Sequence, residues 1–150
     1  MKLFIAEADE ATRVGLQPLS SELEVEFMEG PLSPENASKA SDADLLSVFI
    51  YSKLTASLMR ELPKLKFICT RSTGYDHIDL QEAERRGITV SNVVGYGTLP
   101  VPEHVFALLL ALVRKVKEAD RRVREGDFDY YGLMGVQVCG KTFGVLGTGA

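Results

Sequence analysis

Three stretches of the sequence carry residue types that could bind a small acid or a nucleotide. The first is the pair Gly147 and Gly149, which follows the apolar run 143–146. Glycines placed after a buried strand allow a tight turn and let the backbone approach a pyrophosphate, which the next helix receives at its N-terminus. The third glycine of this fingerprint and the helix would lie beyond Ala150. On its own, the pair fits an ordinary glycine turn equally well.

The second stretch is the polar loop 71–79, with the sequence Arg-Ser-Thr-Gly-Tyr-Asp-His-Ile-Asp. It stands between a predicted strand and a predicted capped helix. We therefore expect it at the carboxyl ends of the strands, where α/β proteins bind ligands. Its backbone N–H groups could hold a carboxylate. The alternative is a connecting loop in which the aspartates only form caps and turns.

The third stretch, 91–105, contains Gly95, Gly97, Pro100 and Pro102 and leads into a long apolar helix. Two glycines and two prolines in such a short segment are typical of a stiff, irregular connection. We interpret 95–100 as a hinge between two domains.

The two histidines are weak candidates for catalysis. His77 lies in the polar loop, and His104 lies in the first turn of the long helix beside Glu103, where residues i and i+1 do not face each other. We expect both histidines to have structural roles. No Cys–His, Ser–His or metal-ligand combination occurs at a suitable spacing, so no metal site is expected.

Strand and helix patterns alternate along the chain. Strict alternation of apolar and acidic residues over 22–28 predicts an edge strand, and the apolar run 45–51 predicts a buried parallel strand. Five βα repeats predict an α/β fold, a doubly wound parallel sheet in the flavodoxin-like order 2-1-3-4-5, followed by a long helix and a sixth strand. The predicted strands are 2–6, 22–28, 45–51, 66–70, 88–94 and 142–146, and the predicted helices are 10–19, 33–40, 55–62, 79–87 and 102–124.

Composition argues against several classes of partner. The net charge is −4 and neither half of the chain has a basic excess, so we expect no nucleic-acid partner. Basic and acidic residues interleave over 114–127, which predicts a solvated, salt-bridged helix face. The longest apolar run, 105–113, is too short to span a bilayer, so no membrane segment is expected. Cys69 and Cys139 stand in apolar surroundings, which predicts buried thiols of a cytoplasmic protein.

Together these motifs resemble the D-isomer-specific 2-hydroxyacid dehydrogenases, most closely their D-lactate dehydrogenase branch. Phosphoglycerate dehydrogenase and glyoxylate reductase are other relatives. The resemblance covers essentially the whole chain, and its parts occur in the family's order. They are Tyr51 within Val-Phe-Ile-Tyr-Ser-Lys-Leu-Thr, the loop 71–79, Gly87-Ile88-x-Val90, Tyr96, Val101-Pro102-Glu103-His104 and the run 143–149.

The resemblance implies a substrate-binding, flavodoxin-like domain over 1–98. Residues 99–150 would be the hinge, the long helix and the first strand of an incomplete NAD-binding Rossmann domain. By the same resemblance, the backbone at Thr73 and Gly74 would hold the carboxylate of a small 2-oxo or 2-hydroxy acid. Tyr51 and Tyr96 would line that pocket. Gly147 and Gly149 would lie under the pyrophosphate of the cofactor.

The family's reaction is hydride transfer between nicotinamide and the 2-carbon of the acid. Its acid/base histidine, the carboxylate that tunes it and its substrate-polarising arginine lie beyond the glycine fingerprint, so the resemblance implies no catalytic residue within 1–150. We therefore expect this chain to be inactive alone and to bind no cofactor. The parent enzyme would use NAD. NADP is not excluded, because the acidic residue that discriminates between the two follows the fingerprint.

Two alternatives remain open. The chain could be a stand-alone flavodoxin-like binding or regulatory module, although a stop directly after Gly149 favours a dehydrogenase fragment; an intact small enzyme is a weaker reading. The apolar side chains of the helix 102–124 need burial. We expect them to fold back onto the chain's own sheet or onto that of a second copy, and we favour the second outcome, a homodimer swapped through this helix.

Overall fold

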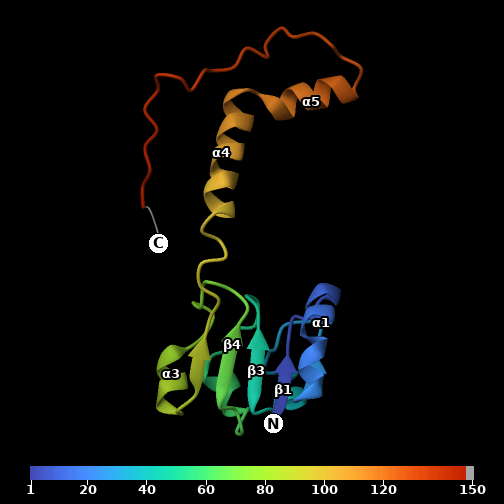
Figure 1. Cartoon of the computed structure of the whole chain (residues 1–150), viewed down its shortest axis with the longest axis vertical. Helices are drawn as coiled ribbons and strands as arrows, with labels where there is room; N and C mark the ends of the chain where they lie inside the picture. The colour runs from blue at the N-terminus through green and yellow to red at the C-terminus, as the bar shows by residue number, and fades with distance from the viewer. Residues whose placement is uncertain (148–150) are drawn as a thin grey trace. The chain divides into compact units, whose positions relative to one another are not determined.

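The computed structural model describes residues 1–147, and the chain forms two compact units, Met1–Val94 and Gly95–Ala150. The first unit contains a five-stranded, wholly parallel sheet (Figure 1). Its strand order is β2-β1-β3-β4-β5, which confirms the predicted order 2-1-3-4-5. The strands are β1 (Lys2–Ile5), β2 (Glu24–Phe27), β3 (Leu45–Val48), β4 (Phe67–Thr70) and β5 (Thr89–Ser91).

The strand β2 lies at the edge of the sheet, as its alternating sequence predicts. Glu24 and Glu26 are exposed, whereas Val25 and Phe27 are half-buried against the smaller of the two hydrophobic clusters that cover the sheet. The central strand β3 is almost wholly buried, as expected for a parallel strand covered on both faces. The hydrophobic pattern of these two strands therefore matches their burial, at the edge of the sheet for β2 and in its centre for β3.

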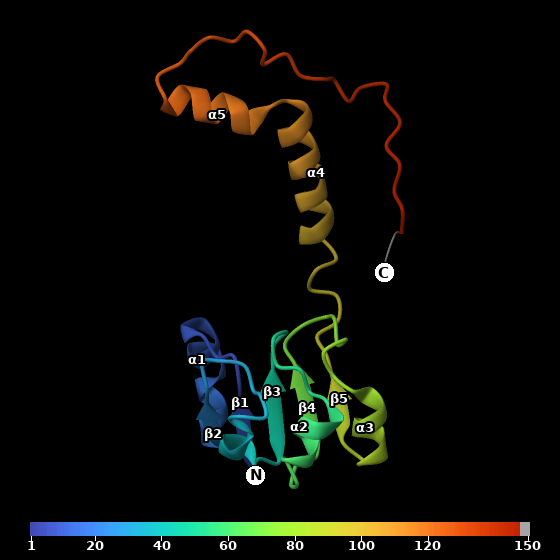
Figure 2. The same cartoon turned by 180° about the vertical axis from the view of Figure 1, so that it is seen from behind.

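Two hydrophobic clusters cover opposite faces of this sheet. The larger cluster joins strand residues such as Phe4 and Leu46 to the helices α2 (Ala56–Arg60) and α3 (Leu80–Arg85) and to the 3-10 helix η2 (Ala37–Ala40) (Figure 2). The smaller cluster packs residues of β1 and β2 against the end of α1 (Glu10–Leu16), which continues as the 3-10 helix η1 (Gln17–Ser21). Successive residues of one strand point to opposite faces, so β1 contributes to both clusters.

Side chains cap three helices of this unit. Asp9, Thr55 and Asp79 each accept a hydrogen bond from a backbone N–H in the first turn of α1, α2 and α3, respectively. The helix expected over 33–40 is wrong in extent, because only the short η2 forms. Its start is prevented by the side chain of Asn36, which accepts from the N–H of Ser33 and so stabilises a turn.

The second unit contains α4 (Pro100–Val113) and α5 (Val116–Arg124), so the prediction of one continuous helix over 102–124 is wrong. The break falls at Lys115, whose φ is 54°. Two contacts take the place of the next helical turn. The N–H of Val136 donates to the carbonyl of Val113 at 2.8 Å, and Lys115 Nζ donates to the carbonyl of Gly132 at 2.7 Å. The following segment therefore caps α4.

The salt-bridged helix face predicted near 114–127 is present on α5. Glu118 pairs with Arg121 at 2.8 Å and with Arg122 at 3.0 Å, and Asp120 pairs with Arg124 at 2.8 Å. Hydrogen bonds from Arg121 and Arg122 lower the pKa of the Glu118 carboxyl to about 2. None of the helices within the described residues is long and apolar enough to cross a bilayer.

The sixth strand predicted over 142–146 is also wrong, since these residues have irregular backbone. A strand is stabilised by pairing with a neighbour, and the described part of the second unit holds no other strand. The ring of Phe143 instead lies 5.8 Å from that of Phe106 on α4. The expectation of two buried thiols is wrong as well. Cys69 is only half-buried, and Cys139 is exposed because its segment packs against no core.

Candidate functional site

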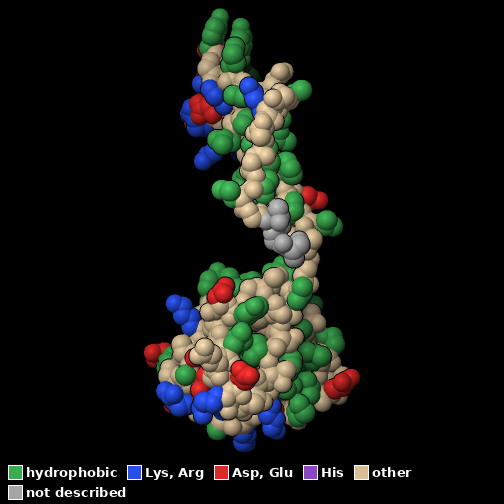
Figure 3. All heavy atoms as spheres, turned by 90° about the vertical axis from the view of Figure 1, so that its left-hand side faces the viewer, with side chains coloured by type: hydrophobic (Ala, Val, Ile, Leu, Met, Phe, Trp, Pro, Cys, Tyr) green, Lys and Arg blue, Asp and Glu red, His purple; other side chains and the backbone are tan. Residues whose placement is uncertain are grey.

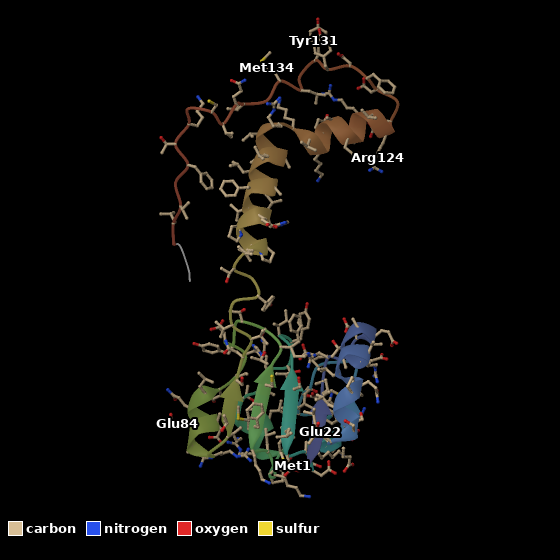
Figure 4. The ribbon with its side chains drawn as sticks, viewed as in Figure 1. Met1, Glu22, Glu84, Arg124, Tyr131 and Met134 are labelled. Atoms are coloured by element: carbon tan, nitrogen blue, oxygen red, sulfur yellow. The ribbon has the colours of Figure 1, made fainter. Side chains whose placement is uncertain are left out.

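The loops that follow the strands gather at one edge of the sheet in the first unit. Since all five strands are parallel, the segments after β1, β3, β4 and β5 emerge at their shared carboxyl edge. Met1, which precedes β1, lies at the opposite edge (Figure 4). Both segments that the sequence singles out in this unit, around Tyr51 and around Thr73, belong to the carboxyl edge. They follow the neighbouring strands β3 and β4.

A carboxylate organises the segment that carries Tyr51. Glu7 accepts hydrogen bonds from the backbone N–H groups of Ile50 at 3.0 Å, Tyr51 at 2.9 Å and Ser52 at 2.9 Å, and more distantly from Phe49 at 3.3 Å. The Ser52 hydroxyl also donates to this carboxylate. Four successive donors thus converge on one side chain, the arrangement by which backbone nests bind anions.

The electrostatics of this contact favour the charged form of Glu7. Burial raises the pKa of its carboxyl. Hydrogen bonds from the Ser52 hydroxyl and from the backbone N–H groups of Tyr51, Ser52 and Phe49 outweigh burial, so the pKa lies below its ordinary value. The backbone of Glu7 has a φ of 55°, a left-handed conformation that is costly for a residue other than glycine. The surrounding contacts must therefore hold it in place.

Arg71 supplies part of that support. Its guanidinium donates to the carbonyl oxygens of Ala6 at 2.8 Å and Glu7 at 2.9 Å, and to the Ser47 hydroxyl at 2.9 Å. Burial lowers the pKa of the guanidinium, and the neighbouring Glu7 carboxylate opposes that shift. Arg71 is also the first residue after β4. The loop 71–79 is therefore connected to Glu7, and through Glu7 to Tyr51.

The loop 71–79 is itself held by side chains. The Ser72 hydroxyl donates to the carbonyl of Gly74 at 2.7 Å, and the Thr73 hydroxyl donates to the carbonyl of Val93 at 2.9 Å. Asn92 donates to the carbonyl of Thr73 at 2.8 Å. The first bond lies within the loop, and the other two join it to the residues that directly follow β5, so the loop after β4 is held by the segment after β5.

Four consecutive residues of this loop, 73–76, are exposed and have backbone N–H groups that donate no hydrogen bond within the described residues, and the predicted pair Thr73 and Gly74 is among them. The carbonyl oxygens of the same two residues are occupied, as described above. The loop therefore holds exposed donors on a restrained backbone, which is the chemistry that a carboxylate requires.

His77 contributes to the same loop from its far end. Its Nε2 lies 3.1 Å from the Thr70 hydroxyl, which also lies 2.6 Å from the Ser72 hydroxyl. The His77 side chain is thus engaged with the loop's own residues. Within the described residues no group of histidine, cysteine and carboxylate side chains is placed to hold a metal ion.

The remaining predicted residues are not all brought together. Tyr51 is 70% exposed and lines a hollow of about 550 Å³. Thr73 and Gly74 do not line that hollow, although their loop starts beside it. Tyr96 and Gly147 belong to the second unit, and Gly149 lies outside the described residues. The hollow is lined by Glu7, Ala8, Asp9, Glu10, Arg13, Glu29, Pro31, Phe49 and Tyr51.

Sequence reasoning assigned no role to three residues that hold this edge together: Glu7, Arg71 and Asn92. Each stands at or just after the end of an apolar strand, where a charged or amide side chain is the first polar group of the carboxyl edge. A polar residue directly after an apolar strand is the sequence feature that could have identified them. Their partners were not predictable, because most are backbone groups, and all belong to segments 19 to 65 residues away.

Comparison with known proteins relates this geometry to enzymes. A family model described as "D-isomer specific 2-hydroxyacid dehydrogenase, catalytic domain" matches residues 4–138. A D-lactate dehydrogenase of Curvularia clavata is 42% identical over 135 residues, which is 89% of this chain and 39% of that protein. A D-3-phosphoglycerate dehydrogenase of Archaeoglobus fulgidus is 34% identical over 149 residues, 99% of this chain and 28% of that protein.

Solved structures of dehydrogenases also resemble this chain. Apo D-lactate dehydrogenase from Escherichia coli matches with a TM-score of 0.82 and 30% identity, over 99% of this chain and 49% of that chain. D-lactate dehydrogenase from Aquifex aeolicus, complexed with NAD and lactic acid, matches with a TM-score of 0.82 and 31% identity, over 91% of this chain and 41% of that chain. The chain thus spans less than half the length of these relatives.

Proposed function

This chain belongs to the D-isomer specific 2-hydroxyacid dehydrogenase family, and from that premise we propose that its first 98 residues bind the substrate of an NAD-dependent oxidoreductase. The reaction would transfer hydride between nicotinamide and a small D-2-hydroxy acid or 2-oxo acid. The observation that carries this proposal is that Thr73 and Gly74 are exposed, that their N–H groups donate no hydrogen bond within the described residues, and that their carbonyl oxygens are held by Asn92 and Ser72.

In this proposal Thr73 and Gly74 bind the substrate carboxylate by donating two backbone hydrogen bonds. Backbone N–H groups form stronger hydrogen bonds to a charged carboxylate than to a neutral amide oxygen, so such a site prefers an acid to its amide. Tyr51 contacts the remainder of the acid. Tyr96 belongs to the second unit, and its role as a substrate residue is proposed on the family resemblance alone. Support for Tyr51 comes from its place on the neighbouring strand end.

The cofactor fits the described residues poorly. Gly147 has a φ of 80°, as a glycine turn requires, but residues 141–146 before it are not a strand. A dinucleotide site needs that strand and a helix N-terminus facing the pyrophosphate. We therefore propose that Gly147 and Gly149 contribute to binding NAD only within a longer enzyme. NADP remains an alternative cofactor, and we expect neither to bind residues 1–150.

Titration of the ¹⁵N-labelled chain with pyruvate tests the carboxylate site. We expect saturable shifts of the Thr73 and Gly74 amide signals with a Kd in the millimolar range, about −4 kcal/mol or weaker. Pyruvamide is the matched control ligand, because it has the same shape without the charge. Equal shifts with pyruvamide, or shifts confined to other residues, would contradict the proposal.

We further propose that the chain forms a homodimer through α4, exchanged between copies over 102–124. Hydrophobic side chains lie along the surface of the second unit (Figure 3), and Phe106, Leu108 and Leu112 are 53%, 58% and 77% exposed. A contiguous apolar surface of this kind marks an interaction site. Sedimentation velocity that shows only a monomer at micromolar concentration would contradict the dimer.

A further inference from the structure

The position of Glu7 calls for a functional explanation. A residue with a φ of 55° that is not glycine is rare, and it persists only where other contacts determine it. Within residues 1–147 its carboxylate forms no ion pair within 4.0 Å of a cationic side chain. It accepts instead from the backbone of four consecutive residues and from one hydroxyl.

We propose that Glu7 is a positioning residue of the substrate site: its carboxylate fixes the backbone that carries Tyr51, and Arg71 fixes Glu7 relative to the loop of Thr73 and Gly74. The inference rests on the proposed function, because it assigns a purpose to the alignment of these two loops. Glu7 itself does not touch the substrate in this scheme.

Hydrophobic burial does not explain the order of this segment. Ile50 is 43% exposed and Tyr51 is 70% exposed, so neither side chain is held by the core. Their N–H groups donate to Glu7 alone among the described residues. Without that acceptor, both residues would be free to adopt other backbone conformations, and the Tyr51 ring would move with them.

The connection continues in both directions from Glu7. Ser52 is fully buried, and its hydroxyl accepts from the N–H of Leu32 at 2.9 Å while donating to Glu7. On the other side, Arg71 binds the carbonyl of Glu7 at 2.9 Å and begins the loop 71–79. A change at Glu7 therefore affects both the backbone around Tyr51 and the position of that segment relative to the loop 71–79.

The test compares Glu7→Gln with Glu22→Gln. Gln keeps the size of the side chain but replaces one acceptor oxygen with a donor, which cannot accept from the N–H groups. Glu22 is an exposed residue near the opposite edge of the sheet, and its carboxylate binds nothing within residues 1–147, so it controls for the lost charge (Figure 4). Pyruvate titration by NMR and amide hydrogen exchange are measured on all variants.

We expect Glu7→Gln to raise the Kd for pyruvate about threefold or more and to speed exchange of the Tyr51 amide at least about tenfold. Glu22→Gln should change neither. In a Tyr51→Ala background, Glu7→Gln should no longer affect the Kd. That loss of effect separates positioning of Tyr51 from a general weakening of the fold, which would persist in the double variant.

Each result decides one point. An unchanged Kd in folded Glu7→Gln, or an equal effect with and without Tyr51, would overturn the positioning role. Unchanged exchange at Tyr51 would overturn it too, even if pyruvate binds. Absence of pyruvate binding to the parent chain would instead remove the proposed function, while exchange still reports whether Glu7 orders the segment. If Glu7→Gln does not fold, Glu7→Asp, which keeps the charge on a shorter side chain, is measured in its place.

Discussion

Asn92 donates a hydrogen bond from Nδ2 to the carbonyl of Thr73 at 2.8 Å, so a residue after β5 holds the loop that follows β4. The carbonyl of Thr73 and the N–H of Gly74 belong to the same planar peptide group. The bond from Asn92 therefore also restricts the direction in which the Gly74 N–H can donate.

Replacing Asn92 with alanine should weaken pyruvate binding more than it weakens the fold. We expect a loss of about 0.5–1.5 kcal/mol in stability, typical of one hydrogen bond, and a several-fold higher Kd. Asn36→Ala is the control, because the side chain of Asn36 likewise bonds to the backbone of a turn, at Ser33 and Pro31, away from the candidate site. Urea unfolding and NMR titration measure both properties. A similar change in Kd for the two variants would contradict a role for Asn92 in the site.

The break between α4 and α5 predicts an unusual response to glycine. Lys115 has a left-handed backbone, so Lys115→Gly should relieve about 1 kcal/mol of strain, which offsets the lost hydrogen bond to Gly132 and leaves the stability of the second unit nearly unchanged. Lys117→Gly, two residues later within α5, should destabilise it by about 1 kcal/mol. Hydrogen exchange of the α4 and α5 amides is the measurement. Equal destabilisation by both would indicate one continuous helix.

Glu7 should make the first unit sensitive to acid. Its folded-state pKa is depressed, so its contribution to stability is present above the unfolded-state pKa and is lost as pH falls through the folded-state pKa. The parent chain should therefore lose more stability than Glu7→Gln from about pH 5 downward, because Gln does not titrate. Urea unfolding at several pH values measures this difference. Parallel curves would show that the carboxylate has no preference for its charged form.

The chain of residues 1–150 should not oxidise NADH with pyruvate or glyoxylate. The family resemblance places the acid/base histidine and the substrate-polarising arginine outside these residues, and His77 is engaged with Thr70 in the loop. Absorbance at the NADH band measures turnover. His77→Gln is the informative control, since activity that co-purifies with the chain and disappears in this variant would assign His77 a catalytic role.

The sequence predicted the fold of the first unit well because its hydrophobic pattern and its strand and helix periods agree. The acidic alternation over 22–28 identified β2 as an edge, and the apolar run 45–51 identified β3 as a buried strand. The second unit was predicted less well. Nothing in the residues around Lys115 marks a helix break, which depends on the distant segment that contacts the carbonyl of Val113.

The candidate site was predicted only in part, for a related reason. The residue types in the loop 71–79 indicate anion binding, and a loop after a parallel strand has a known place in the fold. The links that align this loop with Tyr51 join the side chains of Glu7 and Arg71 to backbone groups. Any sequence supplies such backbone groups, so only the structure could reveal which ones these side chains select.

The left-handed backbone at Glu7 also has a consequence for mutational screens. Glycine would relieve the conformational strain at this position, yet it would remove the carboxylate that orders Tyr51. The two effects oppose each other in the free energy of unfolding but not in ligand binding. A screen that selects variants by thermal stability would therefore tolerate glycine at position 7, whereas a screen for acid binding would reject it. Disagreement between two such screens would identify alignment of the loops, rather than folding, as the property under selection at this residue.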